Sequence, residues 1–579
     1  MKKSSLILFL FISFSGLSQK IDTNENIFHN SSEYRNYQEV YLGNLGLAKY
    51  NLINPFETNN KRLKSLFPST SNTNTFTDVF YVFGSGRENY VDVVHRQQLS
   101  ENLFGSAKIL KTNSEGIYLN QNATLSDFAF NLDYNPKDKR YGFLAQFENY
   151  KRRNNINGGV ADSNFFALLD SGNANIKTTF PTQFIEAAQS ASNYLDLKVM
   201  DVNFRHNYKI SKTITDSTPY FQLTQKLSYH RTQQKIGLRN STSYFEDYNY
   251  DTITTLDSLK LERLSHRFQL DRVSKNMTLS VGIAQNYYEY LGRNPFEIHL
   301  ENLLFTEVKW RDKGFFGRSY FEFMVSDGKY ESYEFKNNIT YRNRSLNIFQ
   351  RFSANANFMT DLPELYANNY RGNHFEWNKV NNRNTIIQLN VSALNEFNGT
   401  KVELNFESQS GAVIFDTNSL PIQTNISLLG FTINKRIQFK KWMYLTTNIH
   451  IQDLISKSEI EVPNLVTYTK LHFKGRLIKK VLKFDAGLSV LYYTNFTPRA
   501  YNSSLDEFYL QSNQRVGNYP IVGFFAEFYI KKNFSFFSTI THLNSGLLKP
   551  VFGNNYLATT EYPLQDRAFK FGIKWRLFD

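Results

Sequence analysis

The last strand-like segment of the chain alternates strictly between hydrophobic and polar residues. From Phe569 to Leu577, the odd positions are hydrophobic and the even positions carry Lys, Gly or Arg. A β-strand points successive side chains to opposite faces, so this alternation predicts one apolar face and one cationic face. Two structures suit such a strand: a barrel in lipid with the apolar face outward, or a soluble sheet that covers a core.

Alternating segments of the same kind recur from about residue 79 to the C-terminus. Clear examples are residues 277–284, 387–393, 401–407 and 482–490. Their polar positions are often Lys, Glu or Asp, which suits a wet interior. We therefore expect an all-β protein, with residues 79–579 forming a closed antiparallel transmembrane β-barrel. An even number of strands leaves both ends on one side, and we predict about 16 or 18 of them.

Turn signals between these segments come in two lengths. Short signals such as Asn135-Pro136 and Asn398-Gly399 predict tight hairpins. Longer polar segments, which we interpret as loops, lie around residues 152–198, 233–261, 358–382, 409–422 and 495–518. Short turns on one rim and long loops on the other are typical of outer-membrane barrels, where short turns are periplasmic and long loops extracellular.

The first 78 residues differ from the rest. Two lysines follow Met1, and an apolar run and small residues at Gly16 and Ser18 come next, which predicts a secretory signal peptide over residues 1–18. Residues 19–78 lack sustained alternation, and we expect an N-terminal periplasmic arm or a segment inside the lumen. At roughly sixty residues this segment is small for the plug domain of an energised transporter, and it shows no recognisable energy-coupling box.

Composition supports a protein exported to the outer membrane. Aromatic residues make up 16% of the chain while mean hydropathy is only −0.46. Apart from the start, no stretch approaches the ~20 apolar residues of a membrane-spanning helix. A transmembrane barrel has this composition because only alternate residues meet lipid and aromatic girdles mark both interfaces. The absence of cysteine excludes a disulfide framework.

The search for catalytic and binding chemistry gives little. The net charge of +14 comes without a concentrated Lys/Arg tract, so we expect no nucleic-acid partner. Ten histidines are scattered singly with no metal-binding spacing, and cysteine is absent. We expect no metal, no cofactor and no enzymatic activity.

Alternation alone nominates residues that face the lumen. They are Asp92, Arg96 and Gln98; Lys401, Glu403, Asn405 and Glu407; Lys483 and Asp485; and Lys570, Lys574 and Arg576. The simpler interpretation is a wall solvated or filled by ion pairs, and the functional one is a charged constriction that selects ions. Both signs of charge are present, so the sequence does not define selectivity.

The C-terminal segment also carries candidate lipid-facing and assembly-signal residues, which are Phe569, Phe571, Gly572, Ile573, Trp575 and Leu577. The spacing Lys570-x-Gly572-x-x-Trp575-x-Leu577 resembles the C-terminal signal by which outer-membrane barrels reach their assembly machinery. Phe578 and Asp579 extend beyond the usual end of that signal.

Several further segments resemble the putative porin family of Bacteroidota. They are residues 41–46 (YLGNLG), 81–90 (YVFGSGRENY), 95–100 (HRQQLS), 113–122 (NSEGIYLNQN), 157–160 (NGGV) with Asp162 and Phe165, and 572–579 (GIKWRLFD). The resemblance implies an outer-membrane β-barrel and supplies no catalytic residues.

Two functions from different classes fit these observations. The first is a porin-like channel for passive diffusion of small hydrophilic solutes. The alternative is a structural or docking barrel in a secretion or assembly complex, with an occluded lumen; a soluble secreted β-protein is a third. The expected partners are outer-membrane lipid and lipopolysaccharide, the barrel-assembly machinery during biogenesis, and other envelope proteins.

Overall fold

The computed structural model describes most of the barrel and a small part of the N-terminal segment. The described residues are 39–41, 49–53, 75–116, 121–134, 136, 140–155, 193–210, 218–239, 248–293, 296–324, 332–361, 365–379 and 382–577, apart from 457, 480, 503, 532, 546–556 and 561. The predicted signal peptide (1–18), most of residues 19–78, and Phe578 and Asp579 lie outside this part. None of the described helices is long and apolar enough to cross a membrane.

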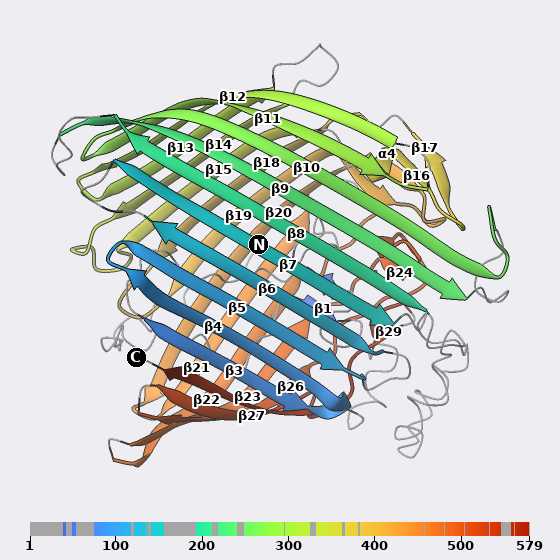
Figure 1. The fold of residues 1–579 in the computed structure, drawn as a ribbon. Helices are drawn as coiled ribbons and strands as arrows, with labels where there is room; N and C mark the ends of the chain where they lie inside the picture. The colour runs from blue at the N-terminus through green and yellow to red at the C-terminus, as the bar shows by residue number, and fades with distance from the viewer. Residues whose placement is uncertain are drawn as a thin grey trace.

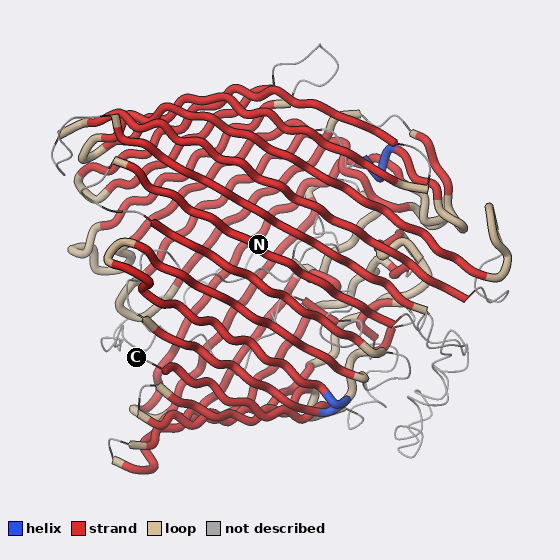
Figure 2. Tube along the Cα trace, viewed as in Figure 1, coloured by secondary structure: helices blue, strands red, loops and turns tan. Residues whose placement is uncertain are grey.

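Twenty-two antiparallel strands follow one another in chain order and close into a barrel (Figures 1 and 2). They are β3 (Phe76–Gly84), β4 (Glu88–Ser100), β5 (Leu103–Ser114), β6 (Ala123–Tyr134), β7 (Tyr141–Asn155), β8 (Tyr194–Lys209), β9 (Tyr220–Arg239), β10 (Thr254–Val273), β11 (Met277–Leu291), β12 (Phe296–Asp312), β13 (Phe315–Met324), β14 (Tyr333–Arg342), β15 (Arg351–Asp361), β18 (Asn384–Leu394), β19 (Lys401–Phe415), β20 (Pro421–Lys440), β21 (Met443–Leu454), β22 (Leu465–Ile478), β23 (Leu482–Tyr493), β26 (Ile521–Ile530), β27 (Phe534–Thr541) and β30 (Ala568–Leu577). The predicted all-β barrel is confirmed.

The predicted number of 16 or 18 strands is wrong, and some predicted loops are also shorter than expected because their ends belong to strands. β9 and β10 have 20 residues each, and their ends take up residues 233–239 and 254–261 of the predicted loop 233–261. Residues 409–422 are the end of β19, a tight turn at 416–420 and the start of β20. Alternation also weakens where the inner face is apolar, as at Leu110 and Leu125. Such positions hide the period of two.

Smaller elements lie between the wall strands or before the first of them. They are β1 (Glu39–Tyr41), β2 (Lys49–Asn51), the 3-10 turn η2 (Ser85–Arg87), α4 (Leu365–Asn368), β16 (Asn369–Arg371), β17 (Glu376–Asn378), β24 (Ala500–Asn502), β25 (Glu507–Tyr509), β28 (Leu557–Thr559) and β29 (Tyr562–Pro563).

The two rims of the barrel differ, as the turn signals predict. One rim carries short connections, such as 313–314 and 441–442, and also holds the start of β3 and the end of β30. We call it the short-turn rim. The opposite rim, the long-loop rim, carries the longest connections of the described barrel, including 494–520 and 542–567. In outer-membrane barrels such long loops are extracellular.

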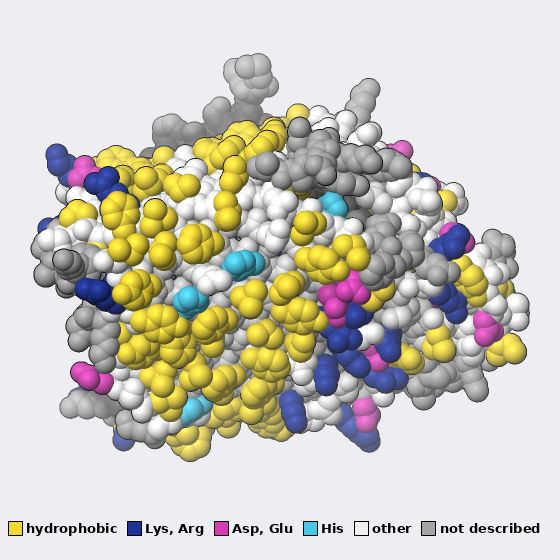
Figure 3. Space-filling model, turned by 45° about the horizontal axis from the view of Figure 1, so that its top comes forward, with side chains coloured by type: hydrophobic (Ala, Val, Ile, Leu, Met, Phe, Trp, Pro, Cys, Tyr) yellow, Lys and Arg dark blue, Asp and Glu magenta, His cyan; other side chains and the backbone are white. Residues whose placement is uncertain are grey.

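The outer face of the wall is apolar (Figure 3). Large hydrophobic side chains are solvent-exposed on strands all around the barrel: Phe83, Ile109, Phe128, Val202, Leu264, Ile283, Ile298, Phe321, Phe358, Val391, Leu404, Ile451, Leu488, Phe536 and Trp575. An exposed apolar surface of this extent suits contact with lipid rather than water. Phe569, Phe571, Trp575 and Leu577 of β30 belong to this surface. Gly572 faces the other way, toward the ring of Phe537.

The barrel closes where β30 pairs with β3. Lys570 lies opposite Gly84, and its Nζ atom reaches past β3 to Glu88 of β4, at 2.9 and 2.8 Å from the two carboxylate oxygens. A Cβ atom at Gly84 would lie only 2.6 Å from the carbonyl oxygen of Phe569 and 2.9 Å from Cγ of Lys570. The absence of a side chain at Gly84 therefore leaves room for the side chain of Lys570 to pass over β3. Nearer the short-turn rim, Arg576 makes two hydrogen bonds to Asp78.

Candidate functional site

The inner wall carries a row of carboxamides across neighbouring strands. Asn338, Asn355, Asn390 and Asn405 are successive register partners on β14, β15, β18 and β19. Each donates a side-chain hydrogen bond to the next, and the central bond, from Asn355 Nδ2 to Asn390 Oδ1, is 3.1 Å long. We call these four residues the amide ladder. Because their spacing follows the strand spacing, the backbone register positions them.

A second polar row lies beside the amide ladder. Asn357 donates to Gln388 at 3.1 Å, and Gln388 donates to Glu407 at 3.0 Å. The two rows, with Arg318, Tyr320 and Lys336, line a hollow of about 480 Å³. Carboxamides both donate and accept hydrogen bonds without carrying charge. The hollow can therefore exchange hydrogen bonds with hydroxyl and amide groups of a solute.

The predicted lumen residues of β19 lie on this same face. Lys401, Glu403, Asn405 and Glu407 alternate along the strand. Lys401 pairs with Glu403 at 2.6 Å, Asn405 belongs to the amide ladder, and Glu407 accepts from Gln388 and from Gln409. In the structure these charges are engaged by neighbours on the wall.

The other predicted lumen residues lie on β4, β23 and β30, on one side of the barrel. Asp485 accepts a hydrogen bond from Nδ1 of His472 at 2.8 Å and pairs with Lys474 at 3.1 Å. Arg96 is buried with its guanidinium over the ring of Phe104, whereas Gln98 is exposed at the short-turn rim. The sequence identified neither His472 nor Lys474.

The remaining members of that set are Asp92, Lys483, Lys570, Lys574 and Arg576. Lys570 and Arg576 form the closure contacts with Glu88 and Asp78. β23, β30 and β4 belong to one arc of six neighbouring strands, and the register places Lys483, Lys574 and Asp92 in one row across it. That these side chains border a solute pathway remains a prediction.

Three segments at the long-loop rim fold together into a structure that we call the lid. They are residues 365–379, 496–516 and 557–564. Tyr370 and Trp377 from the first segment form an apolar cluster with Leu505 from the second and Phe415 at the end of β19. The third segment joins through Tyr562, whose ring lies 5.7 Å from that of Tyr501. Buried aromatic contacts of this kind hold loops in place.

Residues 365–379 are also anchored to the wall at β10. The backbone N–H of Asn373 donates to Asp257 at 2.9 Å, and its side chain donates to Oγ1 of Thr255 at 2.8 Å. Asn373 has no solvent-exposed surface. Burial makes the loss of such hydrogen bonds costly, so this segment is fixed to the barrel.

Residues 496–516 cross the lumen between distant parts of the wall. Tyr509 pairs with Phe415 of β19, while Asp506 accepts a hydrogen bond from Nη2 of Arg152 on β7 at 3.3 Å. β7 and β19 are ten strands apart around the wall, almost opposite each other. Asp506 also accepts a hydrogen bond of 2.7 Å from the hydroxyl of Tyr501. We call the Arg152–Asp506 pair the latch.

The latch lies out of contact with water. Arg152 is 7% exposed and Asp506 is 1% exposed. Burial raises the pKa of Asp506, although Arg152 and the hydrogen bond from Tyr501 oppose the increase. The ionised carboxylate therefore depends on Arg152 and Tyr501, and breaking either contact leaves a buried charge poorly compensated.

A short part of the N-terminal segment also reaches the inner wall. Nε2 of Gln452, on β21, donates a hydrogen bond of 2.8 Å to the carbonyl oxygen of Leu52. Leu52 is buried, and it follows directly after the small β1–β2 hairpin. Gln452 lies in the same register row as Asn405 of the amide ladder, with Gly430 between them.

The sequence alone did not identify the lid, the latch or the amide ladder. The one available signal was in residues 495–518, where Phe496, Leu505, Phe508 and Leu510 are too apolar for a loop in water. Single asparagines gave no signal, because their alignment depends on strand register. Among the described residues, no group of three His, Cys, Asp or Glu side chains could hold a metal ion.

Comparison with known proteins agrees with the barrel fold. A family model described as "Putative porin" matches residues 8–579. No curated protein matches the chain. The FrpB iron transporter from Neisseria meningitidis is 10% identical with a TM-score of 0.58, and the match covers 88% of this chain and 82% of FrpB.

Two further solved structures are similar. The ferric enterobactin receptor PfeA from Pseudomonas aeruginosa is 13% identical with a TM-score of 0.56, over 87% of this chain and 80% of PfeA. The ferric-catecholate import receptor Fiu from E. coli K12 is 7% identical with a TM-score of 0.54, over 87% of this chain and 82% of Fiu. At such low identity these similarities show the fold alone.

Proposed function

Because the chain belongs to the family described as "Putative porin", whose model matches residues 8–579, we propose that it is a gated channel for passive diffusion of small hydrophilic solutes across the outer membrane. The observation that carries the proposal is the carboxamide-lined hollow on the inner wall. Arg318, Lys336 and Glu407 also line the hollow, and its carboxamides can replace part of a solute's hydration shell without holding the solute tightly, as passage requires. The proposal involves no enzymatic step, cofactor or metal.

Single-channel recording in planar bilayers tests this function. The full-length protein is expected to give stepwise conductance with low open probability, because the lid spans the long-loop rim. Liposome swelling with uncharged sugars measures solute passage separately from ion flow. The channel function is contradicted if neither the full-length protein nor a lid-disrupted variant conducts or admits sugars.

The latch favours a second candidate, a docking subunit with an occluded lumen. A buried ion pair and an apolar cluster fix the lid across the barrel, as a permanently closed lumen would require. Affinity purification from gently solubilised membranes discriminates between the two. A channel should be recovered alone or as copies of itself, whereas a docking subunit should bring one defined partner and stay silent in bilayers.

Acidification is expected to favour the closed lid. The pKa of Asp506 is raised by burial in the closed lid and returns toward about 3.9 when the residue meets water. Protonation of Asp506 therefore stabilises the closed state relative to the open state. This stabilisation is lost as pH rises through the raised pKa. Open probability should fall as pH is lowered from about 7 toward about 4. Recording the same series with Asp506→Asn should show no such slope, and an identical slope would refute the assignment to Asp506.

A further inference from the structure

Three lysines form a row on the outer face of the barrel. Lys111 pairs in register with Ser126, Ser126 with Lys151, and Lys151 with Lys198, across β5 to β8. All three lysines are exposed, and they lie on the same face as the exposed side chains of Ile109 and Phe128. Their charges therefore point away from the lumen.

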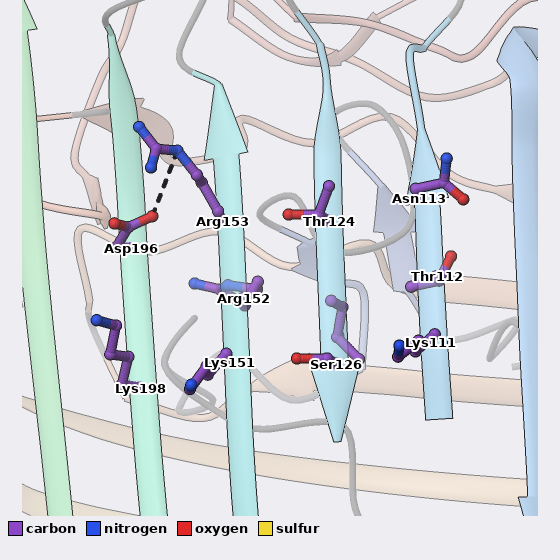
Figure 4. Close-up of a pocket in the computed structure, with 11 residues that line it drawn as sticks. Lys111, Thr112, Asn113, Thr124, Ser126, Lys151, Arg152, Arg153, Asp196 and Lys198 are labelled. Carbon is purple, nitrogen blue, oxygen red and sulfur yellow. Dashed lines mark ion pairs between the residues drawn. The ribbon is translucent and has the colours of Figure 1, made fainter. Parts of the chain in front are cut away.

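The row borders a hollow of about 530 Å³ (Figure 4). Arg153 and Asp196 also line it and pair with each other at 3.6 Å. Arg153 is further held over the ring of Tyr194, 4.1 Å from its centroid. Among the described residues that line the hollow, Asp196 is the one carboxylate, and it pairs with Arg153, which also contacts the ring of Tyr194.

The lysines themselves have no ion pair within the described part of the chain, which omits residues 156–192. Lys151 and Lys198 face each other directly on neighbouring strands. Like charges in directly opposed positions destabilise a sheet. An anion placed between them would remove this repulsion, so the arrangement suits a ligand with concentrated negative charge.

Apolar side chains lie directly beside the row, toward the short-turn rim. Ile109 and Phe128 are two residues along their strands from Lys111 and Ser126, a distance of about 7 Å. Phe130, Phe147 and Val202 form the next row. On the face shown in Figure 3, basic and acidic side chains gather together beside the hydrophobic surface. The cationic row therefore lies at the edge of the lipid-facing surface, on its long-loop side.

We propose that Lys111, Lys151 and Lys198 bind the phosphate of an anionic glycolipid in the outer leaflet. The headgroup phosphate occupies the hollow, and its acyl chains lie along Phe128, Phe130 and the neighbouring apolar positions. An ammonium group makes charge-assisted hydrogen bonds to phosphate oxygens, and three of them match a doubly charged group. A free anion would gain nothing from the adjoining apolar rows.

Binding of a purified glycolipid to the detergent-solubilised protein tests the proposal. The probe is lipid A, an acylated glucosamine disaccharide with two phosphates, measured by native mass spectrometry. Each lysine near an anionic membrane surface contributes about a fivefold factor in affinity, so the triple variant Lys111→Gln/Lys151→Gln/Lys198→Gln should bind roughly 100-fold more weakly. The matched control is Lys313→Gln/Lys441→Gln/Lys479→Gln, which changes three exposed lysines at the short-turn rim.

The triple variant is expected to lose affinity for lipid A, and the control variant is expected to keep it. Dephosphorylated lipid A should bind weakly to the unmodified protein. Equal affinity of the triple variant and the unmodified protein overturns the proposal. Displacement of lipid A by an equal concentration of inorganic phosphate also overturns it, since the hollow would then be a site for free anions. Heat-dependent mobility on gels verifies that each variant forms a barrel.

Discussion

The variant Glu88→Gln is expected to lose about 3–5 kcal/mol of unfolding free energy, because it leaves Lys570 charged and buried without its partner. Glu88 is fully buried and Lys570 is 2% exposed, so water cannot replace the lost carboxylate. The pair joins β4, the second strand of the wall, to β30, its last strand, across the closure of the barrel. Urea unfolding in detergent micelles, followed by tryptophan fluorescence, measures the change.

Two controls separate this effect from a general loss of charge. Glu115→Gln removes an ion pair with Arg87 whose side chains are 53% and 79% exposed, and it should cost less than about 1 kcal/mol. The double variant Glu88→Gln/Lys570→Met removes both buried charges and should recover most of the stability. If Glu88→Gln and Glu115→Gln have the same unfolding free energy, the buried pair does not stabilise the closure.

The variant Arg152→Met is expected to open the lid. Removing the arginine leaves the carboxylate of Asp506 buried without its cation, which destabilises the closed state by about 3 kcal/mol. A change of that size raises the ratio of open to closed lids roughly 100-fold. Single-channel open probability measures the shift, and sugar uptake into liposomes should rise in parallel.

The adjacent residue provides a matched control for the latch. Arg153→Met removes an arginine from the same strand whose side chain points outward and is 52% exposed. It should leave open probability unchanged. Equal behaviour of the two arginine variants would show that the latch does not hold the lid, whereas silence of every variant would contradict the channel function itself.

The sequence was sufficient for the fold class because alternation is a local property. In a strand such as β30 or β19, alternation with a period of two assigns the side chains to two faces, and this pattern does not depend on the neighbouring strands. Short and long connections were likewise visible as turn residues and polar stretches. The number of strands was not visible in the sequence. Apolar residues on the inner face, such as Leu110 and Leu125, interrupt the alternation of hydrophobic and polar positions.

The candidate site depended on contacts between residues far apart in the chain. The amide ladder exists only because register aligns single asparagines of four strands, and register is not encoded by any one of them. Lys570 contacts Glu88 because the barrel closes between its first and last strands. Asp506 contacts Arg152, which lies 354 positions earlier in the chain, because a loop folds back across the lumen. Local patterns set which face each side chain takes. Only closure of the wall and inward folding of its loops decided which side chains meet, since both depend on the geometry of the whole barrel.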